Sequence, residues 1–277
     1  MPASVLWRLR LESGQEPCGW SGRAVHALFL RCVAERDAEL ARSLHDPDIP
    51  RPFTCSSLIW SRPKEEDRSG RVAFVRFTLL DERLLPCALE PPSRVEVGGA
   101  SFTVEAVLRS AGEHPWAGEA SWWALVRPWL QQERPVGEKV ALHFASPTTF
   151  RSQGMFLPLP LPQVVFGSLL QRWNAFAPVA VGPELAEYCR QSVGIARHRL
   201  ETEAISLKEG SRIVGFKGFC VFHFLENEPF LQAQVQLLAD AAFYLGVGYQ
   251  TAVGMGQVRR LRPGTKVSLG EDVDGQR

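Results

Sequence analysis

Four closely spaced glycines near the C-terminus form the stretch of this sequence best suited to binding an anion. They are Gly246, Gly248, Gly254 and Gly256, in the segment LGVGYQTAVGMGQ. Glycine tolerates positive φ and has no Cβ, so such a loop can turn its backbone N–H groups toward a phosphate. No Gly-Lys-Ser/Thr follows, which excludes a nucleotide-hydrolysing P-loop, and a predicted helix precedes the glycines where a dinucleotide fingerprint needs a strand. A glycine-rich turn without a ligand is the alternative, and the local sequence leaves both open.

Six histidines supply side chains whose pKa suits proton transfer near neutral pH. No Asp/Glu cluster with histidine has the spacing of metal ligands, which disfavours a metal-dependent nuclease. Two of the histidines, His26 and His45, fall in one predicted helical region. The other four fall on predicted loops or strands with no partner pattern: His114, His143, His198 and His223.

The bulk composition is that of an ordinary globular protein. The 277 residues allow one large domain or two small ones, with 45% hydrophobic and 22% charged residues. No apolar run approaches the ~20 residues of a membrane span, and the N-terminus alternates as a strand rather than a signal peptide. Six scattered cysteines without a CxxC pair predict a reducing, cytoplasmic setting. A net charge of +1 argues against a general nucleic-acid binder but permits a local phosphate-binding surface.

The first half of the chain predicts the order β, α, β, β, α, β. A strand at residues 5–11 is followed by a helix with Ser21 as its N-cap, and Pro47 and Pro50 end the helical stretch. A short strand ends near Trp60, and residues 116–129 are predicted irregular. The remaining predicted elements are a strand at 72–79, a weak helix at 82–89 and a strand-rich segment at 95–108.

The second half predicts the same order. Strands at 140–144 and 258–261 flank helices at 162–176 and 229–244, with a β-hairpin at 194–207 and 212–224 between the helices. Prolines predict irregular structure from Ser146 to Pro162. The fold class is therefore α+β, with two ferredoxin-like βαββαβ domains in tandem, at residues 1–135 and 136–262. Residues 263–277 are predicted to be a loose tail.

Several segments together resemble the RAMP-superfamily CRISPR repeat-processing endoribonucleases, in the family's order. They are residues 26–58, 146–160, 165–178, 214–222 and the glycine loop. The resemblance implies two tandem ferredoxin-like (RRM-like) domains and cutting of CRISPR precursor RNA inside each repeat, with no metal and no cofactor. The RNA's own 2′-hydroxyl would attack the adjacent phosphate, leaving a 2′,3′-cyclic phosphate and a 5′-hydroxyl. The alternative is a non-catalytic RAMP subunit that binds crRNA in an interference complex.

The resemblance also implies the site residues and the partners. His26 and His45 match the active-site positions of two-histidine members, and the first tyrosine is Tyr188, so a tyrosine in the first half is excluded. Arg51 stands where some members carry a lysine; it could hold the phosphate but is a poor proton donor. The expected partner is CRISPR repeat RNA or its precursor, and a homodimer and other CRISPR-complex subunits are left open.

The spacing of the two histidines sets a geometric condition. On one unbroken helix His26 and His45 would lie about 28 Å apart, too far to share a phosphate. The helix must therefore fold back, and Asp37 could cap a second short helix. His26 would then lie near a helix N-terminus, which favours a neutral base, and His45 near a C-terminus, which favours an acid. Without the resemblance, the simpler interpretation is that His26 lies on the face of an amphipathic helix and that His45 is a helix C-cap.

Further RNA contacts are predicted on the hairpin and on a turn. Alternation could put Arg197 and Arg199 on one strand face, with Lys217 opposite, although Glu201 and Glu203 permit an ordinary solvated face. Arg151 lies in a glycine-containing turn. Trp122, Trp123 and Trp129 could stack bases, although packing explains most of them better. A bulky residue at Gly248 or Gly254 is expected to weaken RNA binding without unfolding the protein.

Overall fold

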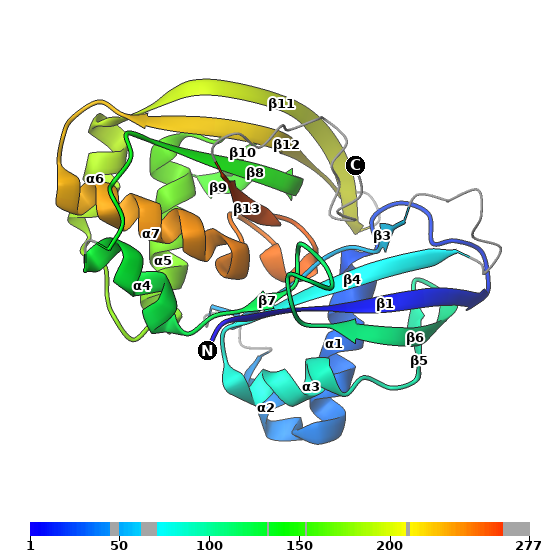
Figure 1. Cartoon of the computed structure of the whole chain (residues 1–277). Helices are drawn as coiled ribbons and strands as arrows, with labels where there is room; N and C mark the ends of the chain where they lie inside the picture. The colour runs from blue at the N-terminus through cyan, green and yellow to red at the C-terminus, as the bar shows by residue number, and fades with distance from the viewer. Residues whose placement is uncertain (45–49, 62–70, 132, 153, 209–210, 263–277) are drawn as a thin grey trace.

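Two antiparallel sheets, one from each half of the chain, form the framework of the protein (Figure 1). The structure is a computed structural model and describes residues 1–44, 50–61, 71–131, 133–152, 154–208 and 211–262. The predicted tail at 263–277 lies outside the described residues.

The first sheet has the strand order β2-β4-β1-β6-β5. β1 therefore lies between β4 and β6, as a ferredoxin-like split βαβ requires. Short β3 pairs with β4, and short β7 pairs with β1. The strands are β1 (Ala3–Ser13), β2 (Phe53–Cys55), β3 (Ile59–Trp60), β4 (Val72–Leu79), β5 (Arg94–Val97), β6 (Ala100–Leu108) and β7 (Gly118–Glu119).

Helices α1 (Gly22–Arg36) and α3 (Leu85–Leu89) cover one face of this sheet, and a 3-10 turn, η1 (Glu82–Leu84), leads into α3 (Figure 1). The apolar residues of α1 recur at helical spacing and are buried, as the sequence predicts. On β1, alternate residues point into the same core, where Trp7 meets Phe77 with ring centroids 4.7 Å apart. The buried apolar side chains of α1 are Val25, Leu28, Phe29, Leu30, Cys32 and Val33.

The predicted reversal of the helical region is confirmed. α1 ends at Arg36, Asp37 adopts an extended conformation, and α2 (Ala38–Ser43) begins directly after it. The Asp37 carboxylate accepts hydrogen bonds from the N–H groups of Glu39 and Leu40, at 3.0 and 2.8 Å, so it caps α2. Ser21 precedes α1 but does not cap it: its hydroxyl accepts from Leu58 N and bonds to Ser57 Oγ instead.

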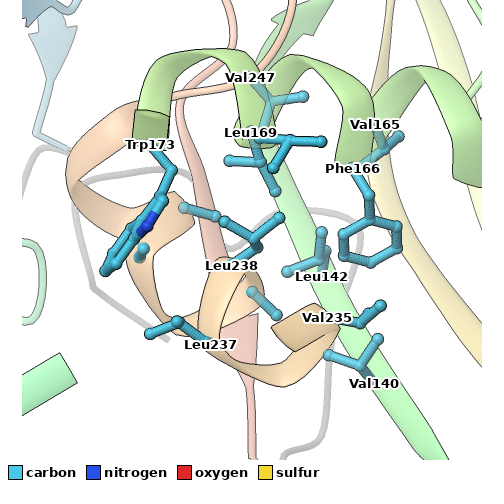
Figure 2. Packing of buried hydrophobic residues seen from close by; sticks show 14 of the residues in the cluster. Val140, Leu142, Val165, Phe166, Leu169, Trp173, Val235, Leu237, Leu238 and Val247 are labelled. Atoms are coloured by element: carbon cyan, nitrogen blue, oxygen red, sulfur yellow. The ribbon is translucent and has the colours of Figure 1, made fainter. Parts of the chain in front are cut away.

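The second sheet has the order β11-β12-β8-β13, which repeats the topology of the first. β11 and β12 form a long hairpin that extends well beyond the helices (Figure 1). Helices α5 and α7 pack on one face, and Figure 2 shows Leu169 and Leu238 meeting between them, with Leu142 of β8 beneath. The elements are β8 (Lys139–Thr148), α5 (Pro162–Phe176), β11 (Val193–Lys208), β12 (Ser211–Phe224), α7 (Pro229–Leu245) and β13 (Val258–Leu261).

Three segments differ from the sequence prediction. The stretch predicted irregular contains α4 (Trp122–Leu130), whose first turn is capped by the Ser121 hydroxyl; Pro128 is tolerated near its end. The proline-rich stretch contains a short hairpin, β9 (Phe150–Ser152) and β10 (Met155–Leu157), because its prolines flank the paired residues. An additional helix, α6 (Glu184–Gln191), follows α5.

A buried arginine joins the two halves of the chain. Arg76 on β4 is 1% exposed, and its guanidinium donates to Ser4 Oγ at 2.8 Å, to Phe243 O at 2.6 Å and to Gln257 Oε1 at 2.6 Å. It also lies over the rings of Trp116 and Phe243, at 4.8 and 4.5 Å. Burial lowers the pKa of Arg76 to about 9, so it stays charged at neutral pH.

Candidate active site

His26 lies where the first half of the chain meets the glycine loop of the second half. It is on the second turn of α1, and its ring stacks on Phe53 of β2, with centroids 5.7 Å apart and planes 19° apart. Its Nδ1 is 3.0 Å from the carbonyl oxygen of Ala252. A carbonyl oxygen can only accept a hydrogen bond, so Nδ1 carries the hydrogen. In the neutral ring, Nε2 then has the lone pair and can accept a proton.

The glycine loop is held in place by contacts with both halves. Ala252 lies in a 3-10 turn, η2 (Thr251–Val253), and packs into the hydrophobic core of the first half. Gly254 forms a parallel bridge to Ser56, just after β2. The Gln257 amide nitrogen donates to the carbonyl oxygen of Cys55 at 3.1 Å, while its amide oxygen accepts from Arg76. These contacts fix the Ala252 carbonyl relative to α1 and therefore to His26.

The four loop glycines are required by the protein's own packing. All four have positive φ: 68° at Gly246, 84° at Gly248, 104° at Gly254 and 68° at Gly256. A Cβ at Gly248 would lie 2.5 Å from Thr149 O, and one at Gly254 would lie 2.7 Å from the Trp20 ring. A bulky residue at either position must displace neighbouring protein atoms, so we expect a loss of stability alongside the predicted loss of RNA affinity, and retention of the fold stays a prediction.

Most of the glycine amides are already hydrogen-bonded within the protein. Gly246 N donates to Ala242 O, Gly248 N to Ser168 Oγ and Gly256 N to Pro147 O, at 3.0, 2.9 and 3.1 Å. These three amides are therefore not available to an anion, and RNA contact by the glycine loop stays a prediction.

Arg51 lies two residues before Phe53, beside a second arginine that the sequence analysis did not single out. Arg172 on α5 donates from Nη2 to the carbonyl oxygen of Arg51 at 3.3 Å. Burial lowers the pKa of Arg172 to about 10, which leaves it charged near neutral pH. The Nε atoms of Arg51 and Arg172 are buried and have no hydrogen-bond partner among the described residues. His45 lies outside the described residues, so its role stays a prediction.

The predicted hairpin residues share one face of the second sheet. Arg199 is opposite Phe219, Phe219 is opposite His143, and His143 is opposite Arg259, so these four point to the same side. The Arg197 guanidinium lies over the same Phe219 ring at 5.5 Å. The core-facing residues of β12 are on the other side, so the prediction that Arg197 and Arg199 avoid the core is confirmed.

Lys217 and Arg151 occupy different surroundings. The Lys217 ammonium lies 2.7 Å from the Glu203 carboxylate and 3.6 Å from that of Glu201, so its charge is compensated. Arg151 is exposed on β9, next to the glycine loop, where Phe156 of β10 contacts Tyr249 with ring centroids 5.7 Å apart.

Two of the other described histidines and two of the three tryptophans of α4 have structural surroundings. His114 Nδ1 accepts from the Trp116 backbone N–H at 3.1 Å. Burial, together with the charge of Arg259, lowers the pKa of His143 to about 4. Trp122 packs edge-on against Trp173 and Trp129 donates to Asp240, whereas Trp123 is 56% exposed.

Neither a metal-binding cluster nor a membrane-spanning helix occurs among the described residues. No group of three or more His, Cys, Asp or Glu side chains there is arranged to hold a metal ion. No helix in that part of the chain is long and apolar enough to cross a membrane.

Comparison with known proteins covers both halves of the chain. Residues 1–127 match the CRISPR Cas6 N-terminal domain, and residues 142–258 match the CRISPR-associated endoribonuclease Cas6. The chain is 32% identical over 120 residues to a CRISPR-associated endoribonuclease Cas6 of Streptococcus thermophilus, and 29% identical over 127 residues to one of Mycobacterium tuberculosis. These alignments span 42% and 46% of this chain but only 48% and 40% of the relatives.

Similar solved structures cover nearly the whole chain. A Cas6 product complex matches 94% of this chain and 100% of its own, with a TM-score of 0.79 and 29% identity. A second Cas6 product complex matches 94% and 99%, with a TM-score of 0.76 and 27% identity. Thermus thermophilus Cas6 matches with a TM-score of 0.72. The N-terminal and C-terminal matches follow one another along the chain in two ferredoxin-like domains, and the chain therefore belongs to the Cas6 family.

Proposed function

We propose that this chain is an endoribonuclease that cuts CRISPR precursor RNA inside each repeat, without a metal ion. The observation that carries the proposal is the contact of His26 with Ala252 O, which leaves Nε2 as the proton acceptor. The names of the relatives, which are Cas6 endoribonucleases and Cas6 product complexes, support the substrate class.

The reaction needs a base, an acid and positive charge. His26 Nε2 takes the proton from the 2′-hydroxyl, the 2′-oxygen bonds to the adjacent phosphorus, and the bond from phosphorus to the 5′-oxygen breaks. The 5′-oxygen takes a proton from the acid, for which His45 is the candidate. The products are a 2′,3′-cyclic phosphate and a 5′-hydroxyl, and no water is consumed.

Arg51 and Arg172 are the candidate cations for the phosphate. The Arg172 guanidinium donates to the backbone carbonyl oxygen of Arg51, which lies two residues before Phe53, the residue on which His26 stacks. Arginine suits this role because it stays charged and matches the geometry of phosphate oxygens. The turn at Asp37 supports a shared site, because it removes the unbroken helix that would separate His26 from His45.

The test is incubation of the protein with its own repeat RNA in excess EDTA. We expect one defined cut, with a 2′,3′-cyclic phosphate on the upstream product. A repeat with a 2′-deoxy nucleotide at the cut should be bound and left whole. Binding of the all-ribose repeat without cutting would instead identify a non-catalytic crRNA-binding subunit.

Six free cysteines are consistent with action in the cytoplasm.

A further inference from the structure

A small cavity lies between the two halves of the chain, at the edge of the glycine loop. Its volume is about 280 Å³. Gly254, which lines it, is two residues from Ala252, the residue that holds His26. The side chains that give it chemical character are Trp20, Trp60, Glu203, Lys217 and Gln257.

Two tryptophans form aromatic walls of this cavity, and each is fixed by neighbours. Trp20 donates from its indole nitrogen to Val253 O at 2.9 Å and lies close over Gly254. Trp60 ends β3, with its ring 6.0 Å from that of Phe102 and the Arg71 guanidinium 5.3 Å from its centroid. Rings held in this way can stack on a flat ligand without losing much side-chain entropy on binding.

The polar side of the cavity pairs a donor with acceptors. Lys217 lies 2.7 Å from the Glu203 carboxylate and 3.6 Å from that of Glu201, so these three side chains together carry a net negative charge. A phosphate would be repelled by two carboxylates. A nucleobase edge suits them, because every base presents at least one N–H donor and one acceptor when unpaired.

The size of the cavity agrees with a single ring system. Cavities that bind small molecules span roughly 300 to 1,000 Å³, so this one is just below that range. It has room for one heterocyclic base, and the sugar and phosphate would stay outside, toward the glycine loop.

We propose that this cavity holds one unpaired nucleobase of the repeat RNA beside the cut, stacked on the tryptophans and read at its edge by Glu203 and Lys217. The proposal rests on the proposed function, since it names a specificity site of the same RNA. It changes the expected role of Lys217 from a phosphate contact to a base contact.

The experiment measures the affinity of repeat RNAs in which one nucleotide at a time is abasic, each carrying the 2′-deoxy block at the cut. In the wild type, the nucleotide in the cavity should lose about tenfold or more in affinity when its base is removed, the size of one stacked base. In Trp60→Ala that single penalty should disappear while the penalties at other nucleotides persist. Phe230→Ala is the matched control, because Phe230 is an exposed aromatic residue on α7 and does not line the cavity.

A second variant keeps the test decisive if Trp60→Ala fails to fold. Glu203→Gln removes a partly exposed carboxylate and should narrow the preference among the four bases at the same nucleotide. The cavity inference is overturned if Glu203→Gln keeps the wild-type preference among the bases and a folded Trp60→Ala keeps the wild-type loss of affinity at the abasic nucleotide. If Trp60→Ala does not fold, the result for Glu203→Gln decides alone. Either outcome is independent of whether the wild type cuts the repeat as proposed. Absence of cutting and of repeat binding by the wild type would instead overturn the proposed function.

Discussion

Gln257→Leu should destabilise the protein by breaking the polar link between its halves. Gln257 is 1% exposed and holds three partners: Arg76 on its amide oxygen, and Cys55 O and Thr54 Oγ1 on its amide nitrogen, at 2.6, 3.1 and 3.3 Å. Leucine has a similar size, so the change removes hydrogen bonds and leaves little cavity.

The magnitude follows from the groups left without a partner. Arg76 would remain buried with one N–H unsatisfied, and a hydrogen bond to a charged group contributes about 2 kcal/mol. Loss of the hydrogen bond to Cys55 O adds about 1 kcal/mol. The expected decrease in the free energy of unfolding is therefore about 3 kcal/mol. Arg76 keeps its hydrogen bonds with Ser4 and Phe243, which limits the decrease.

Urea unfolding followed by circular dichroism measures this decrease. Gln171→Leu is the control, because Gln171 is exposed on α5, and it should change stability by less than about 0.5 kcal/mol. The double variant Arg76→Met with Gln257→Leu should cost less than the sum of the two single changes, because no charge then stays buried without its partner. Wild-type stability in Gln257→Leu would refute this account of the interface.

Three further outcomes are expected. Gly256→Ala should lower the free energy of unfolding in urea by more than about 1 kcal/mol, because φ is 68° and the new Cβ would meet Val247 O. Gly19→Ala is the control for backbone strain alone, because Gly19 has a φ of 76° and no neighbour within 4 Å of the new Cβ. Equal losses in the two variants would contradict the packing argument. The folded-state pKa of His143 is about 4 against 6.5 ordinarily, so the unfolded chain takes up the proton first and stability should fall by up to about 3 kcal/mol as pH drops from 6.5 to 4. His143→Gln should lack this contribution to the pH dependence of stability. If its free energy of unfolding falls with pH as steeply as that of the wild type, the burial argument is contradicted. Replacing Arg197 and Arg199 by Gln should weaken the salt dependence of RNA binding. The slope of the logarithm of the binding constant against the logarithm of the salt concentration should decrease in magnitude by about 0.7 for each phosphate that the two arginines neutralise. An unchanged slope would show that neither residue binds a phosphate.

Much of the fold could be predicted because it depends on local patterns. Alternation located the longer strands, and helical periodicity located α1, α5 and α7 within a few residues. The turn at Asp37 was predictable because an N-cap acts within three residues of its own position. α4 was missed because its aromatic residues and Pro128 hide the helical period. The boundary between residues 135 and 136 stays a prediction.

The parts of the site that depend on contacts distant in sequence were not predictable. Gln257 meets Arg76 across 181 positions and carries no local signal of that partner. The same holds for Ala252, whose carbonyl orients His26 from 226 positions away. Glycine spacing did indicate the loop, but it could not distinguish glycines that face a ligand from glycines that face the protein.

The most direct test of the central claim is single-turnover cutting of repeat RNA by His26→Ala. The account predicts a rate lower by about 10²-fold or more, the size expected when a proton-transfer group is removed, with RNA affinity unchanged. His198→Ala is the matched control, because His198 is exposed on β11, and it should cut at the wild-type rate. A wild-type rate in His26→Ala would contradict the assignment of His26 as the base.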